Sequence, residues 1–209
     1  PLFVLMGEII LQSGISSRFY SGIAGLFRCV PGGLAQTNVV GCAVFSAVAG
    51  SSVATALTVG TVAVREMRAR GYADTLTLGT LTAGGCLGIL IPPSIPLIVY
   101  GSMTQESIID LFMAGVGPGI LLAVIFSVYV AVRVFVTPSL VPKRTTEKLD
   151  LLLAAKNALP VFALVAAVIG GMYAGVVTPT EASGFGSLLA LLLALGYREL
   201  TMDGFGRAL

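Results

Sequence analysis

Long apolar stretches alternate with short polar segments along this chain, and the pattern predicts a series of membrane-crossing helices. A helix needs roughly 20 consecutive apolar residues to cross the hydrocarbon core of a bilayer. The expected crossings are a helix ending at Leu11, then Thr75 to Tyr100, Val116 to Val136, Asn157 to Val176 and Ala182 to Tyr197. The sequence therefore predicts an all-α, multi-pass membrane protein.

Lysine and arginine residues indicate how these helices are oriented. All twelve lie in four polar segments, 18–28, 65–70, 133–156 and 198–207. Two other polar breaks, 101–110 and 177–183, contain none. Because cytoplasmic loops are enriched in basic residues, we expect the four basic segments on the cytoplasmic side and the two breaks on the opposite side.

The apolar stretch from Pro31 to Val64 has to enter and leave the membrane by one face. Arg28 precedes it and Arg65 follows it on the same predicted side. The sequence Gly-Ser-Ser at 50–52 divides the stretch into two arms of roughly 14 to 16 residues, each about 21 to 24 Å long if helical. Each arm is short for a full crossing, so the pattern predicts a re-entrant helical hairpin.

The tip of this hairpin is a candidate binding site. Gly50 relaxes the backbone, and Ser51, Ser52 and Thr55 supply hydroxyl groups at a turn that frees peptide groups. Irregular backbone at membrane depth is tolerated where it is buried in protein or lines a polar cavity. A packing contact of small residues between ordinary helices is the alternative interpretation.

The expected crossing that follows contains a second interruption, in the sequence GCLGILIPPSIP. Pro92, Pro93 and Pro96 lack amide donors and cannot continue a regular helix, and Gly88 precedes them. A break there leaves carbonyl groups that attract cations and amide groups that attract anions, with the Ser94 hydroxyl beside them. A proline kink is the alternative. Two interrupted elements in succession are typical of secondary transporters that bind ions and substrate near the midplane of the membrane.

Composition narrows the classes of function. With 56% hydrophobic and 11% charged residues, and a mean hydropathy of +0.98, the chain cannot bury its apolar surface as a soluble fold, so we expect membrane lipid around it. A net charge of +2 over scattered segments does not indicate nucleic acid. Histidine is absent, the three cysteines are far apart, and no GxxxxGK[ST] loop occurs. These features argue against transition-metal sites, enzyme chemistry and nucleotide-driven transport.

Two further groups of polar residues have competing interpretations. Glu8 is the one acid inside an apolar span, where acids are often functional, but the span ends nearby and an interfacial position is equally consistent. Thr178, Thr180 and Glu181 precede the last expected crossing. Pro179 can open a helix there, and Glu181 suits the positive end of that helix, so we expect these residues to cap it.

Several motifs together resemble one known family. PLFVLMGEI at the start, GSSVAT at 50–55, EMRARGY, GILIPPSIPLIVYG and the later GVVTPTEAS are similar in order and spacing to the large membrane subunit (the permease) of tripartite ATP-independent periplasmic (TRAP) transporters. The resemblance covers nearly the whole chain. It indicates an N-terminal-half fragment of that subunit.

The resemblance implies a sodium-coupled importer of small organic acid anions, such as dicarboxylates or sialic acid, in the bacterial inner membrane. It implies two partners, a small membrane subunit and a periplasmic substrate-binding protein. Sodium ions would be the coupling ions, with no other cofactor, and this chain would supply one repeat of an inverted-repeat, elevator-type transporter. Carried over by position, the motifs assign sodium and substrate contacts to Gly50, Ser51, Ser52 and Thr55 at the hairpin tip and to Gly88, Pro92, Pro93 and Ser94 in the broken helix.

These inferences divide the chain into segments. In order, they are the end of a scaffold helix with an amphipathic cytoplasmic connector (1–30), the re-entrant hairpin (31–64), a discontinuous transmembrane helix (71–101), a transmembrane helix (105–136), a cytoplasmic loop (137–155), two transmembrane helices (156–176 and 180–198) and the start of a connector to a C-terminal half (199–209). An ion channel or pore-forming subunit is the alternative function, because hydroxyl and carbonyl groups can also line a continuous path for ions.

Overall fold

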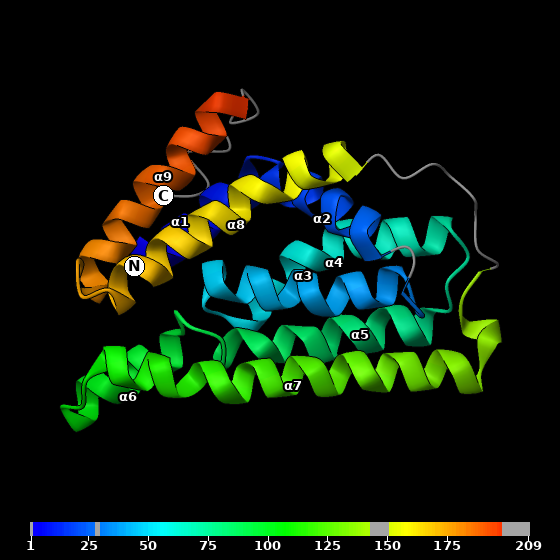
Figure 1. The fold of residues 1–209 in the computed structure, drawn as a ribbon, viewed down its shortest axis with the longest axis horizontal. Coiled ribbons are helices and arrows are strands. Elements are labelled where there is room, and N and C mark those ends of the chain that lie inside the picture. Colours follow the sequence, from blue (N-terminus) through cyan, green and yellow to red (C-terminus); the bar gives the residue numbers. More distant parts are fainter. Residues whose placement is uncertain (1, 28–29, 143–150, 198–209) are drawn as a thin grey trace.

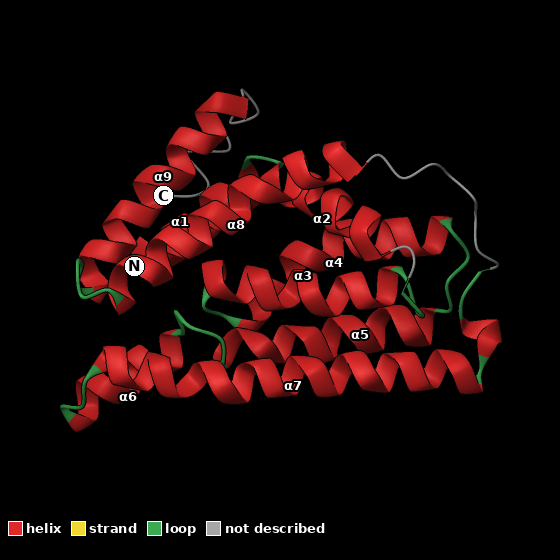
Figure 2. Ribbon diagram, viewed as in Figure 1, coloured by secondary structure: helices red, strands yellow, loops and turns green. Residues whose placement is uncertain are grey.

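A computed structural model describes residues 2–27, 30–142 and 151–197, and within these ranges the chain is helical without strands (Figure 2). The elements are α1 (Leu2–Gln12), α2 (Ile15–Leu26), α3 (Leu34–Ala49), α4 (Ser52–Ala69), α5 (Asp74–Cys86), the 3-10 turn η2 (Leu87–Ile89), α6 (Ile95–Thr104), α7 (Ile108–Val136), the 3-10 turn η3 (Pro138–Leu140), α8 (Leu151–Tyr173) and α9 (Pro179–Tyr197). The predicted connector at 199–209 and residues 143–150 of the predicted loop at 137–155 lie outside the described residues. Residues 151–155 of that predicted loop are the first residues of α8.

Three of the described helices, α7, α8 and α9, are long and apolar enough to cross a membrane. The helices α1 and α2 pass the same test only as a pair, and they meet at an angle of 73°. Gly14 makes this bend with φ 68°, a left-handed conformation that glycine adopts without steric cost. The prediction of an all-α membrane protein is confirmed.

The helices form two groups (Figure 1). In one, α2 packs along α8 and α1 along α9; in the other, α3, α4 and α5 pack against one another and α7 covers α3 and α5. Aromatic side chains join the groups. The ring of Phe19 in α2 meets Phe45 of α3 and Phe162 of α8 edge to face, with ring centroids 5.2 and 5.6 Å apart. The Phe19–Phe45 contact packs α2 of the first group against α3 of the second, and the Phe19–Phe162 contact lies within the first group.

A buried polar network links α2, α3, α4 and α5. The Tyr20 hydroxyl donates to Asn38 Oδ1 at 2.7 Å, and Asn38 Nδ2 donates to Thr80 Oγ1 at 2.9 Å and to Met67 Sδ at 3.1 Å. All four residues are buried. Because a buried polar group without a partner is costly, this network favours one arrangement of the four helices that it links.

Candidate functional site

The two helices α3 and α4 reverse direction at Gly50 and Ser51, where the sequence predicts a hairpin. That this hairpin is re-entrant in the membrane stays a prediction. Figure 1 shows α3 and α4 running back along each other, and the two helices pack together. Gly50 ends α3 with φ 60°, and its amide donates to the Ser46 carbonyl at 3.0 Å. Ser51 is extended, with φ −140° and ψ 132°, and begins α4. Its hydroxyl accepts from the Ala54 amide at the long distance of 3.5 Å, so the serine oxygen is only weakly engaged.

The second predicted interruption is also present. The helix α5 ends at Cys86, tightens into η2, and is followed by a turn from Leu90 to Ser94 before α6 begins at Ile95. Ser94 is fully buried, and its hydroxyl donates to the Ile89 carbonyl at 2.8 Å. In this bond the Ser94 hydroxyl is the donor. The lone pairs of its oxygen are not used and remain able to bind a cation.

The two interruptions meet directly. The Ile95 amide donates to the Gly50 carbonyl at 3.1 Å, which joins the start of α6 to the hairpin tip. A Cβ atom at Gly50 would lie 2.6 Å from the Pro93 carbonyl oxygen. A Cβ atom at Gly88 would lie 2.7 Å from the Ser51 carbonyl oxygen and 2.8 Å from the Ser52 amide nitrogen. The backbones are therefore in contact at two points where only glycine fits.

Pro92 lies on the other side of this turn. A Cβ atom at Gly115 of α7 would be 3.8 Å from Pro92 Cγ and 2.8 Å from the Leu90 carbonyl oxygen. Of the eight predicted site residues, the structure thus brings Gly50, Ser51, Ser52, Gly88 and Pro93 into one contact region, with Ser94 next to it, and places Pro92 against α7. The close approach of α7 to the turn depends on the missing side chain at Gly115.

Thr55 has an unusual environment one turn into α4. The residue is fully buried, and among the described buried side chains its Oγ1 is the polar atom without a hydrogen-bond partner. Its amide donates to the Ser51 carbonyl, so Thr55 is anchored to the hairpin tip. An unpaired buried hydroxyl is unfavourable by roughly 1 to 3 kcal/mol, and a bound ion or ligand would remove this cost.

Four helix ends converge on the contact region with opposite polarity. The C-terminal ends of α3 and of α5 with η2 present carbonyl groups, whereas α4 and α6 direct the positive ends of their helix dipoles to this region. At the start of α6 the Ile95 amide is bonded to the Gly50 carbonyl, and Pro96 has no amide hydrogen. In Figure 1 the α3–α4 turn and the segment after α5 lie at the same end of the bundle. This arrangement can hold a cation at the carbonyl ends and a carboxylate at the amide ends, side by side.

Glu8 lies close to the hairpin tip. A small cavity of about 110 Å³ is lined by Glu8 of α1 together with Ser51, Thr58 and Ile95. Gly7 makes this possible, because a Cβ atom there would be 3.2 Å from Ala49 Cα, so α1 approaches the end of α3 closely. The sequence identifies Glu8 as an acid inside an apolar span. Its position in the same cavity as Ser51 follows only from the fold.

The residues before α9 form the expected helix cap. The Thr178 amide and hydroxyl both donate to Glu181 Oε2 at 2.8 Å, and the Glu181 amide donates to Thr178 Oγ1 at 3.3 Å. This reciprocal pattern is a capping box, and α9 begins at Pro179. The capping prediction is confirmed for Thr178 and Glu181. Within the described ranges, no three His, Cys, Asp or Glu side chains are grouped as metal ligands.

The whole chain, residues 1–209, matches the family model described as the tripartite ATP-independent periplasmic transporter, DctM component. The C4-dicarboxylate TRAP transporter large permease protein DctM of Pseudomonas aeruginosa is 36% identical over 206 residues, which are 97% of this chain and 48% of that protein. The sialic acid TRAP transporter large permease protein SiaM of Vibrio cholerae is 34% identical over 98% of this chain and 48% of that protein. The ectoine TRAP transporter large permease protein TeaC of Halomonas elongata is 33% identical over 92% and 45%. The chain spans about half the length of these relatives.

Proposed function

Because the chain belongs to the DctM family of TRAP transporter large permease subunits, we propose that it forms part of a sodium-coupled importer of small organic acid anions. The family resemblance inferred from the motifs is confirmed, and the family is one of transporters, not enzymes. Its members lie in the bacterial inner membrane, and α7, α8 and α9 fit a multi-pass protein of that membrane.

One observation carries the proposal: the hairpin tip and the broken helix touch each other. Neither interruption alone distinguishes a binding site from a helix kink. Their contact through Gly50, Gly88 and Ile95 brings the ends of α3, α4, η2 and α6 together at one place inside the protein. Irregular backbone at membrane depth requires burial in protein or a polar ligand, and a coupling ion supplies such a ligand.

The sodium ion would bind on the carbonyl side of this contact. We assign it to backbone carbonyls and hydroxyls of the hairpin tip, Gly50, Ser51, Ser52 and Thr55, and of the broken helix, Gly88, Pro92, Pro93 and Ser94. The unpaired Thr55 hydroxyl and the weakly engaged Ser51 hydroxyl support this assignment, because both can turn a lone pair to a cation. Pro92 and Pro93 would act by shaping the turn.

The substrate would bind next to the ion. The amide ends of α4 and α6 face the same region and favour a carboxylate, and a cation beside them strengthens that preference. The relatives are named for C4-dicarboxylates, sialic acid and ectoine, which supports a small organic substrate and does not single out one. The chain spans about half of each relative, so the remaining wall of the site would come from the rest of the subunit.

The same family membership supports the mode of assembly and movement. We propose that the full subunit works with a small membrane subunit and a periplasmic substrate-binding protein. In an elevator mechanism, the group of α3, α4, α5 and α6 would move as a unit, because the Ile95–Gly50 bond joins the broken helix to the hairpin. The group of α1, α2, α8 and α9 would belong to the part against which it moves.

Uptake of radiolabelled dicarboxylate into proteoliposomes tests this function. The full-length subunit, with its small membrane subunit and binding protein, is compared with Ser51→Ala and Ser52→Ala over a range of sodium concentrations at constant ionic strength. Each change is expected to raise the half-saturating sodium concentration about 3- to 10-fold, as the loss of one oxygen contact of roughly 1 kcal/mol predicts. Ser102→Ala, an exposed serine on α6 whose hydroxyl bonds to the Val99 carbonyl, is the matched control. Sodium-independent uptake, or channel-like currents through the wild-type complex, would refute the proposal.

A further inference from the structure

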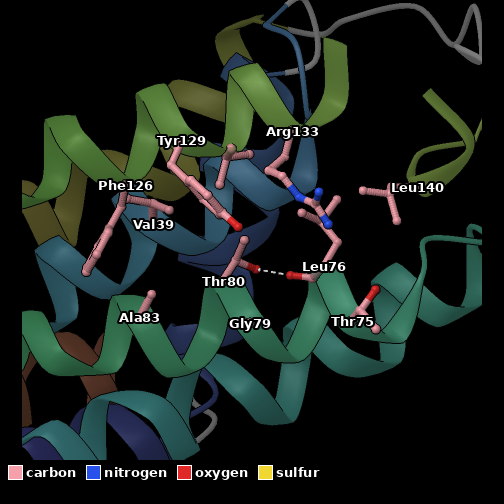
Figure 3. Close-up of a pocket in the computed structure, with 11 residues that line it drawn as sticks. Val39, Thr75, Leu76, Gly79, Thr80, Ala83, Phe126, Tyr129, Arg133 and Leu140 are labelled. Carbon is pink, nitrogen blue, oxygen red and sulfur yellow. Dashed lines mark hydrogen bonds between the residues drawn. The ribbon is translucent and has the colours of Figure 1, made fainter. Parts of the chain in front are cut away.

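A cavity of about 290 Å³ lies between α5 and α7, away from the contact of the two interruptions (Figure 3). Val39 of α3 forms its floor, Gly79 and Ala83 of α5 one wall, and Phe126 and Tyr129 of α7 the other. From Leu76 to Ala83 the wall on α5 is about 10 Å long, seven residues at 1.5 Å each. This is about two thirds of one leaflet of a hydrocarbon core roughly 30 Å thick.

The walls of the cavity are mainly apolar, with Thr75, Thr80 and Tyr129 as the polar exceptions besides Arg133. Thr80 faces it, but the Thr80 hydroxyl donates to the Leu76 carbonyl at 2.8 Å and accepts from Asn38 Nδ2 at 2.9 Å, so both of its functions are used within the protein. Gly79 leaves the wall open, because a Cβ atom there would meet nothing within 4 Å. A hydrocarbon chain fits such a surface, and a polar ligand would lose its hydration without compensation.

One end of the cavity is charged. Arg133, in the last turn of α7, extends its guanidinium group toward the cavity in Figure 3, near Leu76 and Leu140. The structure pairs Arg133 with no acidic side chain among the described residues, whereas Arg68 and Arg70 are paired with Asp74 and Glu66. Arg133 lies at the end of the helix that the positive-inside rule assigns to the cytoplasmic side. Basic sites between helices at this level attract the anionic lipids of the cytoplasmic leaflet.

We propose that this cavity binds one anionic phospholipid of the cytoplasmic leaflet. Its phosphate group pairs with Arg133, and one acyl chain lies along Gly79 toward Ala83. The charge at one end and the apolar wall behind it match the two parts of such a lipid. A helix of a protein partner is about 10 Å wide, too wide to enter a cavity of 290 Å³ between helices that already pack together. This site is separate from the proposed sodium site and does not depend on it.

Native mass spectrometry of the full-length subunit tests the proposal, with titrations of dioleoylphosphatidylglycerol and of dioleoylphosphatidylcholine. The two lipids have the same chains and differ in net charge. Phosphatidylglycerol is expected to bind about fivefold more tightly through its pairing with Arg133. Arg133→Gln should abolish this preference, and Arg133→Lys should retain most of it. Gly79→Leu, which fills the cavity and leaves Arg133 in place, should weaken both lipids. Gly117→Leu on α7, where a Cβ atom also meets nothing within 4 Å, is its control and should change neither.

A second readout locates the acyl chain. The chain contains no tryptophan, so Tyr129→Trp introduces a fluorophore at the cavity wall whose emission is measured against the unsubstituted subunit. Phosphatidylglycerol with brominated chains should quench this added emission, and Gly79→Leu should reduce the quenching. Equal affinity for the two lipids, a preference that survives Arg133→Gln, or binding and quenching that Gly79→Leu leaves intact would each overturn the proposal. The proposal would also be overturned if the large subunit lost the lipid when the small membrane subunit and the binding protein bind to it.

Discussion

The backbone amide of Ile95 donates a hydrogen bond of 3.1 Å to the carbonyl oxygen of Gly50, so the first residue of α6 is joined to the tip of the α3–α4 hairpin. Helix ends inside a membrane protein need partners for their free peptide groups. Here one interruption supplies the donor and the other the acceptor. The hairpin and the broken helix therefore form a single unit, and changes to either are expected to affect both.

Gly50→Ala should destabilise this unit strongly. The left-handed φ of 60° disfavours any side chain by about 1 to 2 kcal/mol, and the new Cβ atom would lie 2.6 Å from the Pro93 carbonyl oxygen. Together these effects should lower the free energy of unfolding by about 2 to 5 kcal/mol. Gly71→Ala is the control, because Gly71 has φ 81° with nothing within 4 Å of a Cβ atom. Unfolding in mixed micelles with increasing SDS measures both; equal losses would mean that the contact with Pro93 is unimportant.

Gly88→Ala tests the second contact without a change of backbone conformation. The added Cβ atom would lie 2.7 Å from the carbonyl carbon and oxygen of Ser51, so the hairpin tip has to move. We expect a loss of about 1 to 3 kcal/mol in stability and weaker sodium dependence of uptake. Gly79→Ala in the preceding helix meets nothing within 4 Å and should be neutral or slightly stabilising. Wild-type sodium dependence in Gly88→Ala would show that the tip does not have to touch η2.

Thr55→Val tests whether the Thr55 hydroxyl has a structural role or is a ligand of sodium. Valine has the same shape but lacks the unpaired Oγ1, so without ligand the subunit should become more stable by about 1 kcal/mol. Sodium affinity should fall at the same time, a combination that a merely structural residue does not produce. Thr77→Val is the matched control: Thr77 is equally buried, its hydroxyl donates to the Ala73 carbonyl at 3.1 Å, and its loss should lower stability and leave sodium affinity unchanged. Thermal unfolding with and without sodium distinguishes the two patterns.

The positions of the two interruptions could be predicted from the sequence because they follow from local chemistry. Glycine followed by two serines ends and restarts a helix, and Pro92 and Pro93 cannot continue one. Their contact could not be predicted in this way. It depends on the packing of α4 against α5, and on the absence of side chains at Gly50 and Gly88. The prediction that these residues bind sodium rests on the family resemblance and stays a prediction.

The Asn38 network was missed, although its signal is visible. Asn38 follows Gln36 and Thr37 near the start of an apolar stretch, and a buried amide in such a place needs several partners. Its partners, Tyr20, Met67 and Thr80, are 18, 29 and 42 residues away in the sequence. No periodicity connects positions so far apart, so only the fold identifies the network. The structure places Pro92 beside Gly115 of α7, and its assignment to the site stays a prediction.

Tyr20→Phe should measure the strength of this network. The change removes the 2.7 Å bond to Asn38 Oδ1 and leaves that oxygen buried without this donor. We expect a loss of about 1 to 2 kcal/mol in stability, toward the upper end of side-chain hydrogen bonds in membrane proteins. Tyr100→Phe, at an exposed tyrosine, should change stability by less than about 0.5 kcal/mol. Thermal unfolding of the purified full-length subunit compares the two variants. If Tyr20→Phe had the stability of the wild type, another group would have to donate a hydrogen bond to Asn38 Oδ1.

Glu8→Gln tests whether the acid on α1 contributes to cation binding at the hairpin. Glu8 shares a cavity of about 110 Å³ with Ser51 and Thr58, and a carboxylate facing a partly enclosed site raises the local concentration of cations. Glutamine keeps the size of the side chain and removes the charge. The half-saturating sodium concentration for uptake should rise about 3- to 10-fold, corresponding to roughly 1 kcal/mol. Stability should fall by no more than about 1 kcal/mol, the contribution expected of an anion near the N-terminal end of α4.

The comparison that decides the role of Glu8 is with Glu106→Gln. Glu106 is exposed in the turn between α6 and α7 and does not line the cavity. The substitution Glu106→Gln therefore removes one negative charge from the subunit but leaves the charge of Glu8 near the hairpin tip in place. If net charge alone attracts sodium, both variants should shift the half-saturating concentration equally. If Glu8 acts through the cavity that it shares with Ser51, only Glu8→Gln should do so, and the effects of Glu8→Gln and Ser51→Ala should be less than additive, because both remove contributions to one site.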